Sequence, residues 1–117
     1  MQAVLKYPKI AVIRPHGALN AANALEFERD LTTALAQDGI SVLVVNLAAV
    51  ESLDSAGLMA LVSALKLAGS LGRGFQLCSI SPTLRIIFEM TQLDRIFEIL
   101  EDEAELPTEN LTSGLCV

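Results

Sequence analysis

The chain has 117 residues, of which 52% are hydrophobic and 19% charged, and it carries a net charge of -6 at pH 7. This composition suits one globular domain with its own core and excludes a disordered chain or two independent cores. The negative charge disfavours direct nucleic-acid binding, because the protein would repel a phosphate backbone. No apolar run approaches the roughly 18 residues of a bilayer-spanning helix, so we expect a cytoplasmic protein without membrane contact.

Two short apolar segments, residues 4–7 and 10–14, open the chain and are separated by a proline and a lysine. This break predicts a pair of antiparallel strands at an edge of the sheet. Apolar residues then recur at helical spacing between Asn20 and Gly39, which predicts a helix capped by Asn20 or Asn23.

Residues 41–47 are continuously apolar and rich in valine. Such a run is typical of a central strand that is covered on both faces. The connection from residues 10–14 is long enough for a crossover helix, so we predict parallel pairing of these two strands with a right-handed connection.

A second helix is predicted from Asp54 or Ser55, and three glycines between residues 69 and 74 end it. Residues 75–80 form the next expected strand, and Ser81-Pro82 has the serine cap and first-turn proline that begin a third helix. Residues 93–100 predict one helical turn followed by a last strand.

Helices therefore alternate with strands after an antiparallel start, which predicts an α/β fold with a mixed sheet of four or five strands flanked by helices. We expect a single domain over residues 1–106. The acidic and polar segment at 107–117 is predicted to be a flexible C-terminal tail.

Groups suited to catalysis are scarce, which indicates a protein that is not an enzyme. His16 is the single histidine, and a turn position beside a glycine suits a surface role better than that of a base. Ser55 lacks the Gly-x-Ser-x-Gly context of a hydrolase, because Leu53 stands at the first glycine position. Cys78 and Cys116 have no metal-ligand spacing, so no metal or cofactor is expected.

Ser55 combines a helix N-terminus with two small neighbours, Ala56 and Gly57, that leave it accessible. One interpretation is a helix cap, worth about 1 kcal/mol. The other is a phosphorylation site, where phosphate adds about -1.5 to -2 charges at pH 7. The helix dipole favours that charge, so phosphorylation is expected to preserve the fold while preventing a partner from docking.

The helix that follows Ser55 has an unusually apolar outer face. Between Asp54 and Arg73 its only charged residue is Lys66. Ala56 and Met59 fall away from the core-facing stripe, so this face either docks a protein or is covered by the same domain.

Four motifs share the pattern of one known family, and they are Gly17-Ala-Leu-Asn20, Val44-Val-Asn-Leu47, Leu53-Asp-Ser-Ala-Gly-Leu58 and Leu77-Cys-Ser-Ile-Ser-Pro82. Through them, residues 10–100 resemble the STAS-domain antagonists of bacterial anti-sigma factors. This resemblance implies the STAS (SpoIIAA-like) fold, in agreement with the α/β fold predicted above.

The resemblance also implies a mechanism and a site. In this family an anti-sigma factor serine kinase phosphorylates the serine that corresponds to Ser55, and a PP2C-type phosphatase removes the phosphate. The unphosphorylated form binds the kinase and frees the sigma factor, so transcription is regulated indirectly by partner switching. The residues expected to contact the partner are Asp54, Ser55, Ala56, Gly57, Met59 and Asn20.

One departure from the family concerns the turn before the first helix. The family commonly carries an acidic pair there, whereas this chain has Ala18 and Asn20. An alternative function is therefore a STAS-type module that senses a ligand or joins a signalling complex while Ser55 stays unmodified.

Overall fold

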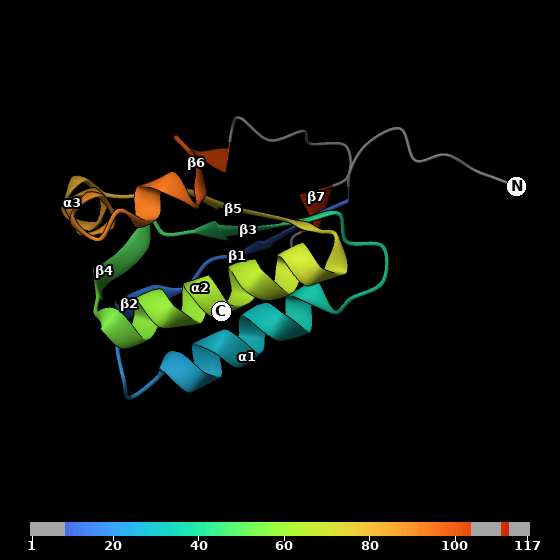
Figure 1. Ribbon diagram of the computed structural model, residues 1–117, viewed down its shortest axis with the longest axis horizontal. Coiled ribbons are helices and arrows are strands. Elements are labelled where there is room, and N and C mark those ends of the chain that lie inside the picture. The colour runs from blue at the N-terminus through green and yellow to red at the C-terminus, as the bar shows by residue number, and fades with distance from the viewer. Residues whose placement is uncertain (1–8, 104–110, 113–117) are drawn as a thin grey trace, which may run out of the picture.

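A five-stranded sheet lies at the centre of the computed structural model, which describes residues 9–103 and 111–112. Its strands follow the order β6-β5-β3-β1-β7 (Figure 1). Their bounds are Ile10–Ile13 (β1), Val42–Asn46 (β3), Gly74–Cys78 (β5), Glu98–Leu100 (β6) and Leu111–Thr112 (β7). Every pairing among these strands is parallel, as crossover connections through helices require.

Two long helices, α1 (Ala24–Leu35) and α2 (Ser55–Leu71), pack against each other and cover one face of the sheet (Figure 1). Both begin at the same end of the molecule. The third helix, α3 (Pro82–Met90), starts at the Ser81 cap and leads through a 3-10 turn, η1 (Leu93–Arg95), into β6.

The central strand β3 is buried on both faces, which explains its apolar run from Val42 to Val45. Leu43 and Val45 point into the main core beneath α1 and α2, where the side chains of both helices converge. Val44 points the other way and is buried with Ile10 and Val12 in a smaller cluster. The sheet therefore lies between two apolar clusters and contributes side chains to both.

The α/β class, the five-stranded sheet, the central strand and the parallel crossover from β1 to β3 are confirmed. The helices predicted after Asn20, at Ser55 and at Pro82 are also present. Within the described residues β3 and β7 flank β1, which was predicted to belong to an antiparallel hairpin at the sheet edge. Residues 4–7, its predicted antiparallel partner, lie outside the described residues.

The predicted tail at 107–117 is described only at Leu111–Thr112, where β7 pairs with Ile10 and Ala11 of β1. The first strand, β1, and the last strand, β7, are therefore neighbours in the sheet. The remainder of that range lies outside the described residues, so tail flexibility stays a prediction.

A separate two-stranded sheet joins β2 (His16–Leu19) to β4 (Ala49–Leu53), and the sequence analysis did not predict it. Both strands are short and mostly exposed or half-buried, so neither shows the apolar run of a core strand. His16, expected in a turn, begins β2. Gly17 permits a β-bulge there with its positive φ of 76°, a conformation that favours glycine.

Candidate functional site

The small β2-β4 sheet positions the candidate site, because both strands end next to it. Leu19 and Leu53 are paired at the carboxyl ends of the two strands. The next backbone N–H, that of Asp54, donates a hydrogen bond of 3.1 Å to the Leu19 carbonyl oxygen. The turn that begins at Asn20 and the start of α2 are thereby fixed side by side, although they are more than 30 residues apart in sequence.

Asp54 is the N-cap of α2. Its Oδ1 atom accepts hydrogen bonds from the Ala56 N–H at 2.9 Å and from the Gly57 N–H at 3.1 Å. These bonds satisfy two backbone donors that the first helical turn leaves without partners, and they place negative charge at the positive end of the helix. Of the two caps that the sequence allowed, the structure selects Asp54.

Ser55 is therefore the first helical residue and not the cap. Its side chain is exposed, and its hydroxyl makes no hydrogen bond within the described part of the chain. A hydroxyl that the fold does not use for capping is available to an enzyme or a partner.

Gly57 is required by a close approach between α2 and the β2-β4 sheet. A Cβ atom at this position would lie 2.7 Å from Leu53 Cδ1 and 2.8 Å from the Leu19 carbonyl oxygen. Gly57 is also buried, so it serves packing in this structure, while its expected contact with a partner stays a prediction. Its absent side chain allows the helix to begin against the sheet and present Ser55.

The turn that precedes α1 is held by two asparagine side chains. Asn20 Oδ1 accepts from the Ala22 N–H, and Asn23 Oδ1 accepts from the Asn20 N–H, each at 2.9 Å. Asn23 Nδ2 donates to the Ala18 carbonyl oxygen at 2.8 Å. Asn20 is thus half-buried in a stiff turn beside Asp54, which places it at the edge of the candidate site.

The first turns of the two long helices carry exposed apolar side chains. Met59, one helical turn after Ser55, is 57% exposed, and Leu25 at the start of α1 is 71% exposed. Ala56 is half-buried, while Leu58 and Leu61 on the opposite side of α2 are buried. The start of α2 is therefore covered by its own domain on one side only.

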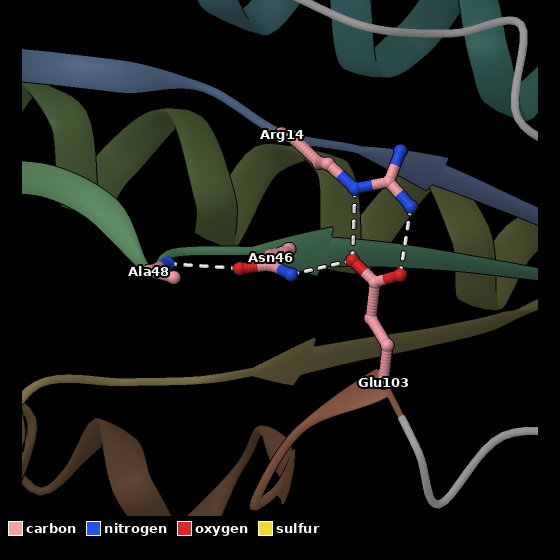
Figure 2. Close-up of polar contacts among 4 residues, drawn as sticks. All are labelled: Arg14, Asn46, Ala48 and Glu103. Atoms are coloured by element: carbon pink, nitrogen blue, oxygen red, sulfur yellow. Dashed lines mark hydrogen bonds and ion pairs between the residues drawn. The ribbon is translucent and has the colours of Figure 1, made fainter.

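A polar network that the sequence analysis missed joins the ends of two strands to the C-terminal segment (Figure 2). Arg14 donates to both Glu103 carboxylate oxygens, from Nε at 2.9 Å and from Nη2 at 2.7 Å. Asn46 Nδ2 donates to the same carboxylate, and Asn46 Oδ1 accepts from the Ala48 N–H at 2.8 Å.

Hydrogen bonds from Arg14 lower the pKa of Glu103 below its usual 4.5, and the hydrogen bond from Asn46 adds a smaller effect. Partial burial acts in the opposite direction. Arg14 and Glu103 are 89 residues apart, so no local sequence signal could have predicted the pair. The network ties the segment that follows β6 to the sheet.

Among the described residues, no cluster of histidine, cysteine and carboxylate side chains could hold a metal ion. The thiol of Cys78 is buried in the smaller apolar cluster, and this burial raises its pKa. In the same part of the chain, no helix has both the length and the apolar character needed to cross a membrane.

The fold and site define a small α/β domain with an exposed serine at the start of a capped helix. The sequence matches the STAS domain family over residues 2–106, and the chain belongs to this family. A protein from Thermotoga neapolitana, named as a candidate anti-sigma factor antagonist, is 30% identical over 96 residues, which cover 82% of this chain and 85% of that protein.

Solved structures of anti-sigma factor antagonists also share the fold of this chain. The crystal structure of a candidate anti-sigma factor antagonist from Thermotoga maritima is 28% identical and superposes with a TM-score of 0.76, over 88% of this chain and 86% of that one. Unphosphorylated SpoIIAA, an anti-sigma factor antagonist, is 19% identical with a TM-score of 0.64, over 89% and 90% of the two chains. The SpoIIAA-like fold predicted from the sequence is thus confirmed.

Proposed function

We propose that this protein is an anti-sigma factor antagonist that binds an anti-sigma factor serine kinase while Ser55 is unphosphorylated. Phosphorylation of Ser55 releases the partner, and a PP2C-type phosphatase restores binding. The observation that carries the proposal is the division of roles at the start of α2, where Asp54 caps the helix and Ser55 keeps an exposed hydroxyl.

The cap geometry supports a switch that acts on the surface and spares the fold. Asp54 already accepts from the Ala56 and Gly57 N–H groups, so a phosphate on Ser55 does not find these donors free. Its charge stays exposed next to the Asp54 carboxylate. A docking partner would have to desolvate this clustered negative charge, which opposes binding.

The comparisons support the same proposal. The Thermotoga relatives that share about 30% of their residues with this chain are named as anti-sigma factor antagonists. SpoIIAA, which shares the fold, has been solved in both an unphosphorylated and a phosphorylated form. Phosphorylation is therefore compatible with this fold.

The decisive experiment compares Ser55→Ala and Ser55→Asp in pull-downs, alongside mass spectrometry of the protein isolated from its own cells. We expect phosphate on Ser55. We expect Ser55→Ala to retain a serine kinase, and Ser55→Asp to bind that kinase at least about tenfold more weakly, a loss of about 1.4 kcal/mol.

Ser52→Asp is the matched control, because Ser52 is an exposed serine on β4 that lies outside the α2 cap. It should retain the kinase as the unmodified protein does. If Ser55 carries no phosphate and both Ser55 variants retain the same partners, the switch is wrong, and the module that senses a ligand becomes the better explanation.

A further inference from the structure

A pocket of ≈ 290 Å³ lies between β2 and α1, beside the candidate site. Its apolar lining includes Leu19 and Phe27, which are 4% and 3% exposed. Its titratable lining consists of His16 from β2 and of Glu26 and Asp30 from α1. The pocket thus combines an apolar wall with two carboxylates and no lysine or arginine.

The two carboxylates lie one helical turn apart on the same face of α1, where like charges repel each other. The helix dipole compensates Glu26, which lies in the first turn, but it does not compensate Asp30 in the same way. Within the described residues neither side chain forms an ion pair. Arg29 is exposed and does not line the pocket.

The pocket is physically continuous with the Ser55 site through Leu19. The Leu19 side chain lines the pocket, while its carbonyl oxygen accepts the Asp54 N–H hydrogen bond at 3.1 Å. Asn23, which also lines the pocket, holds the turn containing Asn20. Leu19 is therefore shared by the pocket and the contact that fixes the start of α2.

We propose that this pocket receives an arginine side chain of the protein partner that docks on the Ser55 surface. The inference rests on the proposed function for the identity of that partner. A guanidinium group offers paired N–H donors to Glu26 and Asp30, and it is weakly hydrated enough to lie against Leu19 and Phe27. The carboxylate pair then gains a countercharge that the described residues do not supply.

The pocket is tested first without any partner, by NMR titration of the full chain with N-acetyl-arginine methylamide. Shift changes are expected at the amides of Leu19, Asn23 and Phe27, and the neutral citrulline analogue should not cause them. Glu26→Gln/Asp30→Asn should weaken binding about fivefold or more, as expected from the loss of two partly exposed ion pairs.

Glu28→Gln/Asp38→Asn is the matched control, because it removes the same charge from side chains that do not line the pocket. It should bind the arginine probe as the unmodified protein does. Equal shifts with the citrulline analogue, or equal binding by the two double variants, would overturn the arginine pocket. This outcome does not depend on whether Ser55 is a switch.

The partner is tested second, with the kinase that Ser55→Ala retains. Glu26→Gln/Asp30→Asn in the Ser55→Ala background should bind that kinase about tenfold more weakly and with less dependence on salt. If the arginine probe binds but kinase affinity is unchanged, the pocket serves a free guanidinium compound and the proposed occupant is wrong. Failure of Ser55→Asp to release the kinase would instead contradict the proposed function alone.

Discussion

At the start of α2, adjacent residues have separate tasks that their positions in the helix explain. The Asp54 carboxylate reaches the N–H groups two and three residues ahead, as N-cap residues do. The next residue, Ser55, already has helical backbone geometry, and its hydroxyl projects from the first turn into solvent. The proposed modification of Ser55 would therefore leave the Asp54 cap in place.

Gly57 provides a test of how closely this turn must pack. We expect Gly57→Ala to destabilise the protein by about 1–3 kcal/mol, because the added methyl group overlaps the Leu19 carbonyl oxygen and the Leu53 side chain. The measurement is urea unfolding followed by circular dichroism.

Gly69→Ala is the control for Gly57→Ala. Gly69 lies in the same helix, and a Cβ atom there meets nothing within 4 Å. The higher helix propensity of alanine should then stabilise the protein by about 0.5–1 kcal/mol. A Gly57→Ala protein as stable as Gly69→Ala would show that the close approach is not required.

Among the structural elements, the β2-β4 sheet connects the turn before α1 to the turn before α2. Because its strands are parallel, their carboxyl ends lie at one edge, and the residues that follow them meet there. This small sheet joins the Asn20 turn to the Ser55 helix. The two strands add Leu19, Val50 and Leu53 to the main core and also position the candidate site.

The segment after β6 is tied to the sheet by the Arg14–Glu103 ion pair, and this contact makes a pH-dependent prediction. The pKa of Glu103 is lowered in the folded protein, so its stabilising effect is present above the usual value of 4.5 and is lost as pH falls through the folded pKa. Glu103→Gln should therefore reduce the free energy of unfolding by about 1 kcal/mol at pH 7.

The difference between Glu103→Gln and the unmodified protein should shrink below pH 4.5, as measured by urea unfolding across a pH series. Glu101→Gln is the control, since Glu101 is an exposed carboxylate two residues earlier. A difference that is constant from pH 7 into the acid range would show that Glu103 acts through packing and not through its charge.

In the whole molecule, the side chains that hold the fold together and those proposed to bind the partner lie on different sides of α2. Leu61 is fully buried in the main core, and Leu61→Ala should cost about 2–5 kcal/mol in the free energy of unfolding. Met59 is 57% exposed, and Met59→Ala should change stability by no more than about 0.5 kcal/mol.

The two variants should rank in the opposite order in their effect on kinase binding. Leu61→Ala must be assayed under conditions where the protein is folded. Met59→Ala should weaken binding, because a flexible apolar side chain at the centre of a contact surface contributes to it. If Met59→Ala unfolds the protein, or leaves kinase binding unchanged, the exposed face of α2 is not the partner surface.

Much of the fold could be predicted because its signals are local. The continuous apolar run of β3, the helical spacing of α1 and the Ser81-Pro82 start of α3 each depend on residues close together in sequence. The pairing of β1 with β7 was not predicted, because β7 lies about 100 residues later in the chain. Strand order depends on such distant pairings, which no local pattern records.

The candidate site was only partly predictable for the same reason. Ser55 and Asp54 could be identified from the helix start, but which of the two capped the helix depended on backbone geometry. The burial of Gly57, the pocket beside Leu19 and the Arg14–Glu103 contact all involve residues from separate elements. No pattern in the sequence shows that these residues come together.

The sequence by itself determined the α/β class, the positions of the helices and the exposed serine at the start of α2, because propensity, capping and hydrophobic spacing act between near neighbours. Only the tertiary structure decided the strand order, the β2-β4 sheet that sets Asn20 beside Asp54, and the joining of the acidic pocket to the Ser55 site. These features arise where packing brings distant segments together, and each depends on the shape and charge of both partners.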